Sequence, residues 1–236
     1  MTPPESATHL YIAATDGVAT DPANTSSGAL TAFHDLAPGL EDLAERSDFC
    51  AGSTLTLPRP SPCLRIIAAG LLVLTDEDSA LCVTVADQGS PIPSRATSGV
   101  WLNGGSILEI PAARVVERYG ASVALAVLER AAALAQAAAQ SELVCVVRHT
   151  ATRRLSRWLS QIFRQTDTVT LSQADLARLT GLQRTSVCQA MATIQGDGAV
   201  KVARGKITLR DAGVLSRLAC DCGGRACASE PRLLTG

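Results

Sequence analysis

LSQADLARLTGLQRTSVCQAMATIQGDGAVKVARGKITLR occupies residues 171–210, and this stretch decides the fold of the C-terminal half. Ser172 precedes Asp175 by three residues, a pattern typical of a helix start. Gly181 can adopt the left-handed backbone that ends a first helix and begins a tight turn. The residues that follow predict a second helix and a β-hairpin. We interpret the stretch as a winged helix-turn-helix, a motif that reads DNA.

The second predicted helix has one apolar face and one polar face. Val187, Met191 and Ile194 form the apolar stripe. The polar face of such a helix enters the major groove. A helical hairpin with a polar surface is the alternative, but small Ala177 beside the turn glycine favours the DNA-binding motif. The residues expected to contact DNA are Ser172, Gln183, Arg184, Thr185, Ser186, Gln189, Arg204 and Lys206, the last two at the hairpin tip.

The net charge of −1 on the 236 residues conceals a strong asymmetry between the two halves. Residues 1–140 carry 7 arginines against 15 acidic residues, whereas residues 141–236 carry 14 basic against 7 acidic residues. A basic half joined to an acidic half indicates that only one part of the chain meets a polyanion. Only seven residues are aromatic, which argues against a protein that stacks single-stranded bases.

Short apolar segments separated by Pro, Gly and Asp predict strands in the N-terminal half. Their spacing is typical of a small antiparallel β-sandwich or jelly-roll-like domain, which makes the expected fold class α+β. A short helix over residues 36–46 is expected before the strands, because its leucines share one face. The expected strands are 53–57, 63–75, 81–86, 100–102 and 107–110.

A long helix is predicted from Pro111 to about Gln140, because proline is favoured in the first turn of a helix. Gly120 weakens the helix locally. Its alanine-rich apolar seam allows another helix to approach closely. The seam faces either the chain's own core or a second copy, and the DNA-binding motif downstream favours a homodimer. The expected interface residues are Leu125, Leu128, Ala132 and Ala135. A second helix is expected over residues 142–165.

This order of elements resembles the Crp–Fnr transcription regulators, and local motifs strengthen the resemblance. Cys145-Val-Val-Arg-His149 with Arg154-Leu-Ser-Arg-Trp-Leu159 is similar to the family's Cys/His element and its following helix, and Ala219-Cys-Asp-Cys222 is similar to a common ending. The resemblance implies a homodimer that binds an inverted-repeat operator in double-stranded DNA and adjusts recruitment of RNA polymerase. It divides the chain into a loosely ordered extension (1–28), a degenerate cyclic-nucleotide-binding-like sensor domain (29–110), a dimerisation helix (111–140), a winged helix-turn-helix domain (141–222) and a tail (223–236).

Two departures from the family pattern limit what the resemblance implies. Thr185 and Gln189 stand where the family often has Glu and a second Arg, so its best-known operator is not expected here. A cyclic-nucleotide pocket in the family uses a Gly-Glu pair and an Arg-Ser or Arg-Thr pair, but no Glu stands beside Gly89, and Ala96 follows Arg95. Arg95 could hold a phosphate or could be a solvated loop residue. We therefore expect no response to cyclic AMP through the usual pocket.

The remaining chemistry-bearing residues support few alternatives. Cys220, Cys222 and Cys227 could serve a thiol- or metal-sensing regulator, which is the alternative hypothesis, although the expectation is that no metal or other cofactor is bound. The three histidines are dispersed, and no paired nucleophile and base is found, so an enzyme is not expected. No uninterrupted apolar run reaches the roughly 18 residues of a membrane span, and no secretory signal is found. These features indicate a cytoplasmic bacterial protein that associates with the nucleoid when bound to DNA and has no membrane partner.

Overall fold

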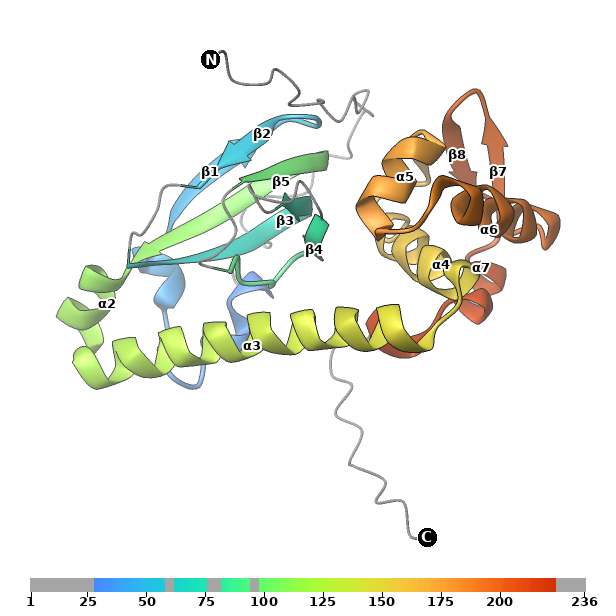
Figure 1. Cartoon of the computed structure of the whole chain (residues 1–236). Helices are drawn as coiled ribbons and strands as arrows, with labels where there is room; N and C mark the ends of the chain where they lie inside the picture. The colour runs from blue at the N-terminus through green and yellow to red at the C-terminus, as the bar shows by residue number, and fades with distance from the viewer. Residues whose placement is uncertain (1–27, 58–61, 76–81, 94–97, 224–236) are drawn as a thin grey trace, which may run out of the picture.

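The computed structural model describes residues 28–57, 62–75, 82–93 and 98–223 (Figure 1). Within them, an antiparallel sheet forms the N-terminal part, a long helix runs beneath it, and a helical domain with a small sheet forms the C-terminal part. The predicted α+β class and the order of its parts are confirmed. The predicted N-terminal extension lies outside the described residues except for Gly28.

The N-terminal strands form one five-stranded antiparallel sheet in which β5 pairs with β1, β2 and β3, and β3 pairs with β4. The two strands expected over 100–102 and 107–110 are one strand, because Gly104, at φ +74°, lets the chain bend without ending the pairing. The described strands therefore curl as a single sheet and are not divided between two sheets. They are β1 (Glu45–Phe49), β2 (Thr54–Thr56), β3 (Cys63–Thr75), β4 (Cys82–Ala86) and β5 (Ser98–Pro111).

A bulge at Gly70 decides which face each half of β3 presents to the rest of the molecule. Gly70 has φ +90°, and a Cβ there would lie 2.0 Å from the carbonyl oxygen of Gly104, so no other residue fits without moving the backbone. Before the bulge, Leu64 and Ile66 pack beneath the sheet, whereas after it Leu71 joins the core of the C-terminal domain. The extra residue shifts the side-chain alternation, which would otherwise continue unchanged along the strand.

The segment before the sheet does not form the helix expected over 36–46. It forms two short 3-10 helices, η1 (Thr31–Phe33) and η2 (Leu40–Leu43), and Arg46 already belongs to β1. Pro38 and Gly39 interrupt the pattern, because Gly39 adopts φ +78° and caps η2 from a left-handed conformation. The apolar residues of this segment still pack beneath the sheet.

The predicted long helix is broken at its start and extends further than expected. Gly120, at φ +87°, separates α2 (Ala112–Tyr119) from α3 (Ala121–Arg148). The helix expected over 142–165 accordingly begins only at α4 (Ala151–Ile162), after an extended connection at His149 and Thr150. The Thr150 side chain caps α4 by accepting a hydrogen bond from the Arg153 amide.

One face of α3 packs against the sheet, and much of the remaining surface is apolar and exposed. Ala124, Val127 and Ala131 lie in the core beneath the sheet. By length and composition alone, α3 is apolar enough to cross a membrane, although no uninterrupted apolar run of that length exists. Arg130 in its middle pairs with Asp35 at 2.5 Å, so α3 is tied to the rest of the N-terminal part.

The C-terminal domain packs four helices against a three-stranded sheet of order β6-β8-β7. Its core contains Trp158, Leu176, Val187 and Ile194, contributed by three different helices. The elements after α4 are β6 (Thr168–Thr170), α5 (Gln173–Thr180), α6 (Arg184–Gly196), β7 (Val200–Ala203), β8 (Lys206–Leu209), α7 (Ala212–Leu218) and η3 (Asp221–Gly223).

The curled sheet also contacts the C-terminal domain directly. Gln165 bridges the two parts, because its side-chain oxygen accepts from Asn103 at 3.1 Å and its side-chain nitrogen donates to the Gly70 carbonyl at 3.1 Å. Leu71 and Val73, which follow Gly70 in β3, pack in the core of the C-terminal domain at the same contact. The contact between the sheet and the C-terminal domain therefore depends on Gly70, the residue at which the side-chain alternation of β3 shifts.

Candidate nucleic-acid interface

Side-chain and backbone capping fix the geometry of the first helix of the motif, α5. The Ser172 hydroxyl accepts from the Asp175 amide, and the Asp175 carboxylate accepts from the Ser172 amide, which completes a capping box. Gly181 ends the helix at φ +62°, as predicted from the sequence. Arg154 of α4 donates to the Thr180 carbonyl at 2.6 Å, so the turn is also held from below.

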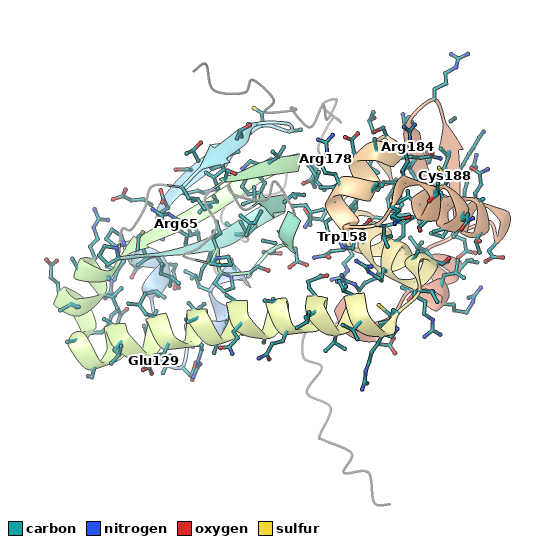
Figure 2. All side chains as sticks on the ribbon, viewed as in Figure 1. Arg65, Glu129, Trp158, Arg178, Arg184 and Cys188 are labelled. Atoms are coloured by element: carbon teal, nitrogen blue, oxygen red, sulfur yellow. The ribbon has the colours of Figure 1, made fainter. Side chains whose placement is uncertain are left out.

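The second helix, α6, divides into a buried and an exposed face as the sequence predicts. Val187, Met191 and Ile194 are 4% exposed or less and lie in the domain core. Gln183, Arg184, Thr185 and Gln189 are exposed, and Ser186 is half-buried. Arg184 and Cys188 lie on the part of the domain that faces away from α3 (Figure 2). A polar, solvent-exposed helix N-terminus is what insertion into a major groove requires.

The hairpin of β7 and β8 forms a tight turn whose tip carries cations. Arg204 and Gly205 both have positive φ, 51° and 78°, and lie between the paired residues Ala203 and Lys206. Positive φ at both central positions defines the type I′ turn that matches strand twist. Arg204 and Lys206 are exposed. The Leu171 amide donates to the Gly205 carbonyl at 3.1 Å, which fixes the wing next to the start of α5.

An open hollow of about 330 Å³ lies between the helix-turn-helix and the wing. Ser172 at the start of α5, Arg184 at the start of α6 and Gly205 of the wing all line it. Two of the expected DNA-contacting residues, Ser172 and Arg184, therefore lie around one concave surface with the glycine that separates Arg204 from Lys206 in the wing.

Gln173 and Cys188 form a contact that the sequence did not predict. The Cys188 thiol donates to the side-chain oxygen of Gln173 at 2.8 Å and links α6 to α5. The two residues lie 15 positions apart on different helices, so no pattern within one helix predicts the contact. The angle between α5 and α6 brings them together.

The residues expected at a dimer interface do not share a single environment. Leu125 is 58% exposed and Ala132 is exposed, but Leu128 packs partly against the core beneath the sheet, and Ala135 is half-buried. The exposed apolar face continues beyond the expected helix end at Gln140. Its members on α3 are Leu125, Ala132, Ala139, Leu143, Val146 and Val147, which we call the α3 stripe.

The inner face of the sheet is filled by side chains. Phe49 and Trp101 stack with 5.5 Å between ring centroids, and Ile67 and Leu72 pack in the same cluster. In the loop after β4, Asp87 accepts from the Ser90 hydroxyl and lies 3.7 Å from Arg164 of the C-terminal domain. Arg95, the candidate phosphate ligand, lies outside the described residues.

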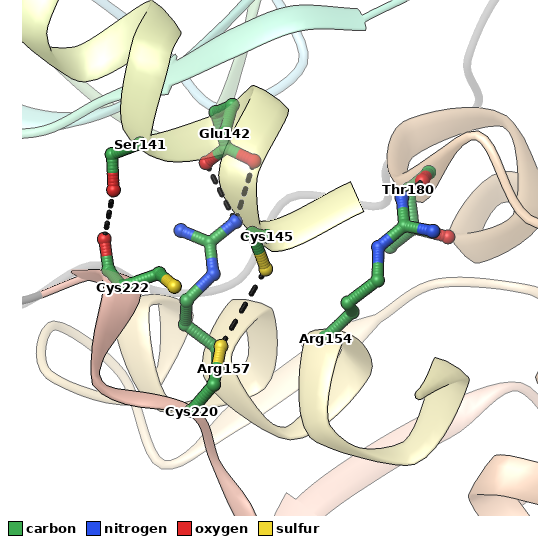
Figure 3. A network of polar contacts seen from close by, with 8 residues as sticks. All are labelled: Ser141, Glu142, Cys145, Arg154, Arg157, Thr180, Cys220 and Cys222. Carbon is green, nitrogen blue, oxygen red and sulfur yellow. Dashed lines mark hydrogen bonds and ion pairs between the residues drawn. The ribbon is translucent and has the colours of Figure 1, made fainter. Parts of the chain in front are cut away.

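The structure changes the membership of the expected cysteine cluster. Cys220 and Cys222 of the alternative hypothesis lie together, Cys227 lies outside the described residues, and Cys145 of α3 joins the first two (Figure 3). Cys145 and Cys220 are buried, with 3.5 Å between their sulfur atoms. Burial raises the pKa of Cys145 to about 12, and burial likewise raises that of Cys222. Sequence reasoning missed this partner because 75 residues separate Cys145 from Cys220.

Comparison with known proteins identifies the motif and the fold. A family model described as a Crp-like helix-turn-helix domain matches residues 153–218. No match is found among curated proteins.

The whole fold is similar to solved structures of bacterial regulators. A putative transcriptional regulator of the Crp/Fnr family from Eubacterium rectale is 14% identical, with a TM-score of 0.58 over 80% of this chain and 94% of that chain. FixK2 from Bradyrhizobium japonicum is 16% identical, with a TM-score of 0.56 over 75% and 98% of the two chains. A CRP/FNR-family regulator from Thermus thermophilus is 17% identical, with a TM-score of 0.53 over 74% and 97%.

The fold and the helix-turn-helix together define a DNA-binding transcription regulator. Residues 153–218 carry a Crp-like helix-turn-helix domain, and the fold that joins it through a long helix to an antiparallel N-terminal sheet is similar to that of Crp/Fnr-family regulators.

Proposed function

We propose that this regulator acts as a homodimer that recognises an inverted-repeat operator in double-stranded DNA. The observation that carries the proposal is the exposed polar start of α6, which shares one concave surface with the capping serine of α5 and the wing. The surface lies in the half of the chain that carries the excess of positive charge. Cations beside a groove-reading helix supply affinity, and the helix supplies specificity.

Arg184 is the residue that we assign to base recognition. An exposed arginine at the start of such a helix can donate two hydrogen bonds to a guanine edge, a contact worth about 1–3 kcal/mol of discrimination. In the proposed complex, Gln189 favours adenine or a water-mediated contact, and Thr185 offers no carboxylate to a cytosine. The operator should therefore differ from the one best known in the family.

Arg184→Ala tests this assignment in a competition titration against operators selected from random sequence. The variant should bind about 5- to 150-fold more weakly and lose its preference at one base pair of each half-site. Arg153→Ala, on α4, is the matched control and should leave that base preference unchanged. An Arg184→Ala protein with unchanged affinity and specificity would refute the assignment.

The α3 stripe is the surface that we assign to the homodimer. Leu125, Leu143 and Val147 are 58%, 65% and 77% exposed, and 125, 132, 139 and 146 repeat every seven residues. Apolar residues at a seven-residue spacing with small alanines between them favour a closely packed helix pair. A membrane contact would use the same apolar composition but does not require that spacing.

Leu125→Asp combined with Leu143→Asp tests the dimer by sedimentation. The paired charges would be desolvated at the interface, so monomers should form and operator affinity should collapse, because one half-site offers too few contacts. Val116→Asp, a charge placed on an exposed valine of α2, is the control and should leave the dimer intact. A double variant that stays dimeric would exclude the α3 stripe as the interface.

We further propose that the N-terminal domain does not respond to cyclic AMP through the usual pocket. The support lies in the sequence and in the loop after β4. No glutamate stands beside Gly89 to accept from a ribose hydroxyl, and Asp87 is engaged with Ser90 and close to Arg164. Physiological cyclic AMP should leave operator affinity within about twofold, a coupling under ~0.5 kcal/mol. Calorimetric binding accompanied by a tenfold gain in DNA affinity would contradict this.

The remaining parts of the proposal follow from the class of protein. We propose a cytoplasmic regulator without enzymatic activity that associates with the nucleoid through its operators and adjusts recruitment of RNA polymerase. Its proposed domain division follows the ranges given above from the sequence, except that the dimerisation helix continues to Arg148. A pull-down of RNA polymerase on operator DNA, with and without the regulator, tests the polymerase contact.

A further inference from the structure

Three cysteine thiols that lie far apart in the sequence converge at the junction between α3 and the C-terminal domain. The sulfur atoms of Cys145, Cys220 and Cys222 all lie within 4.8 Å of one another, and Cys145 and Cys220 are 3.5 Å apart. Tetrahedral zinc–thiolate bonds of about 2.3 Å place sulfur atoms roughly 3.8 Å apart. The cluster therefore needs only small adjustments to hold one metal ion.

The three cysteines come from two segments of the chain, the end of α3 and the segment after α7. Cys145 lies in the last turn of α3, Cys220 lies between α7 and η3, and Cys222 lies in η3. The Ser141 hydroxyl, one helical turn before Cys145, donates to the Cys222 carbonyl (Figure 3). This hydrogen bond holds η3 against α3, and the thiols of Cys220 and Cys222 lie close to that of Cys145.

A buried arginine beside the thiols provides a second, independent observation. The Arg157 side chain is 7% exposed, and its terminal nitrogen donates to both oxygens of Glu142 at 2.6 Å. Its Nε is buried and has no hydrogen-bond partner among the described residues. A buried donor without an acceptor is costly and unusual. The positive charge acts on Cys145 and Cys222, so thiolates there would gain a compensating cation.

We propose that Cys145, Cys220 and Cys222 bind one thiophilic metal ion, such as Zn²⁺, as three thiolates. Each thiol releases its proton as its sulfur bonds to the metal, so loading three neutral thiols releases three protons. Three thiolates and Zn²⁺ carry a net charge of −1, and the guanidinium of Arg157, although paired with Glu142, lies beside that charge and lowers its cost. The fourth coordination position stays open to solvent or to a small ligand, as it does at zinc sites with three protein ligands.

The affinity of the site for a metal ion depends on the protonation state of the thiols. Burial raises the Cys145 pKa to about 12, so without metal the thiol stays neutral at physiological pH. Metal binding removes these protons, and affinity must therefore rise with pH. A disulfide between Cys145 and Cys220 would require an external oxidant and would leave Cys222 without a role.

The bound ion would join two parts of the chain that otherwise meet through few polar contacts. It would tie the last turn of α3 to the segment after α7, across the extended connection at His149 and Thr150. This makes the metal a clamp on the position of the DNA-binding domain relative to α3.

Zinc titration of the reduced, chelator-treated full-length chain against a chromophoric chelator tests the proposal without DNA. The wild-type chain should bind one Zn²⁺, and serine substitution of Cys145, Cys220 or Cys222 should each weaken binding at least tenfold. Cys50→Ser removes an exposed thiol far from the cluster and should change nothing. Absence of stoichiometric binding, or a Cys222→Ser variant that binds like the wild type, would overturn the proposal.

A measurement on the wild-type chain protects the test against misfolded variants. X-ray absorption of the zinc-loaded protein should show at least three sulfur neighbours at about 2.3 Å. Zinc should also protect the half-buried Cys222 from alkylation while exposed Cys50 remains reactive. Fewer than three sulfur neighbours, or unprotected Cys222, would show that the three thiols do not form the site.

Discussion

Neutralising Glu142 should destabilise the C-terminal domain far more than neutralising a glutamate in a surface ion pair. The Glu142 carboxylate faces one guanidinium nitrogen of Arg157 with both oxygens at 2.6 Å. The arginine side chain is 7% exposed and the glutamate 25% exposed. Glu142→Gln keeps the shape and one acceptor oxygen but leaves the buried guanidinium without a countercharge.

The expected loss follows from this geometry. Removing one partner of a buried ion pair costs about 3–5 kcal/mol, because the other charge remains desolvated. The partial exposure of Glu142 and the retained hydrogen bond place the effect at the lower end, about 3 kcal/mol. The matched control is Glu45→Gln, because Glu45 and its partner Arg114 are 64% and 48% exposed at 2.7 Å. Such surface pairs contribute at most about 1 kcal/mol.

Urea unfolding followed by tryptophan fluorescence separates the two parts of the chain. With Trp101 replaced by Phe, Trp158 reports on the C-terminal domain, and with Trp158 replaced by Phe, Trp101 reports on the sheet. Glu142→Gln should lower the midpoint seen by Trp158 with little change in slope, whereas Glu45→Gln should barely move the midpoint seen by Trp101. Equal shifts for the two variants would refute the argument that burial makes the Glu142–Arg157 pair essential.

Three further predictions address the wing, the cap and the thiols. Replacing Arg204 and Lys206 by Ala should weaken binding to all DNA sequences and reduce the salt dependence of log K by about one to two units, and a loss confined to the operator would contradict a phosphate role. Ser172→Ala should lower the free energy of unfolding by about 1 kcal/mol through loss of the capping box, and an unchanged urea midpoint would contradict this. Because the Cys145 pKa is raised from 9.0 to about 12 on folding, the folded state holds a proton that the unfolded state loses. Stability should therefore fall from about pH 9 upward, by at most about 1.4 kcal/mol per pH unit, and this slope should shrink in Cys145→Ser.

The helix-turn-helix could be predicted because its signals are local. The capping box at Ser172, the left-handed Gly181 and the apolar stripe of α6 each act over a short stretch of chain, and all three appear as expected. The wing could be predicted as well, because its tight turn needs positive φ at its centre and Gly205 permits it. Local propensity and tertiary packing agree throughout this segment, so nothing overrides the pattern.

The errors in the N-terminal half arose where glycine or proline acts against an apolar pattern. The leucines over 36–46 share a helical face, but Pro38 and Gly39 break the helix, and only packing beneath the sheet is retained. Gly120 breaks the long helix completely, whereas Gly104 does not interrupt its strand. Glycine permits several backbone conformations, and only the surrounding packing selects one of them. The three-thiol cluster could not be predicted for a related reason, because its members depend on how α3 meets the segment after α7.

The function of α3 follows from the different contacts that it makes along its length. Its buried face packs beneath the sheet, its exposed stripe is the proposed dimer surface, and its last turns contact the C-terminal domain through Glu142 and Cys145. Only the extended connection at 149–150 joins α3 to α4. In a dimer built on α3, the spacing of the two recognition helices is therefore set by how firmly its C-terminal end is attached to the DNA-binding domain. Operators in which half-sites lie one helical turn apart require that spacing to be held closely. A buried ion pair and a metal clamp at this junction would therefore act on operator affinity without touching DNA.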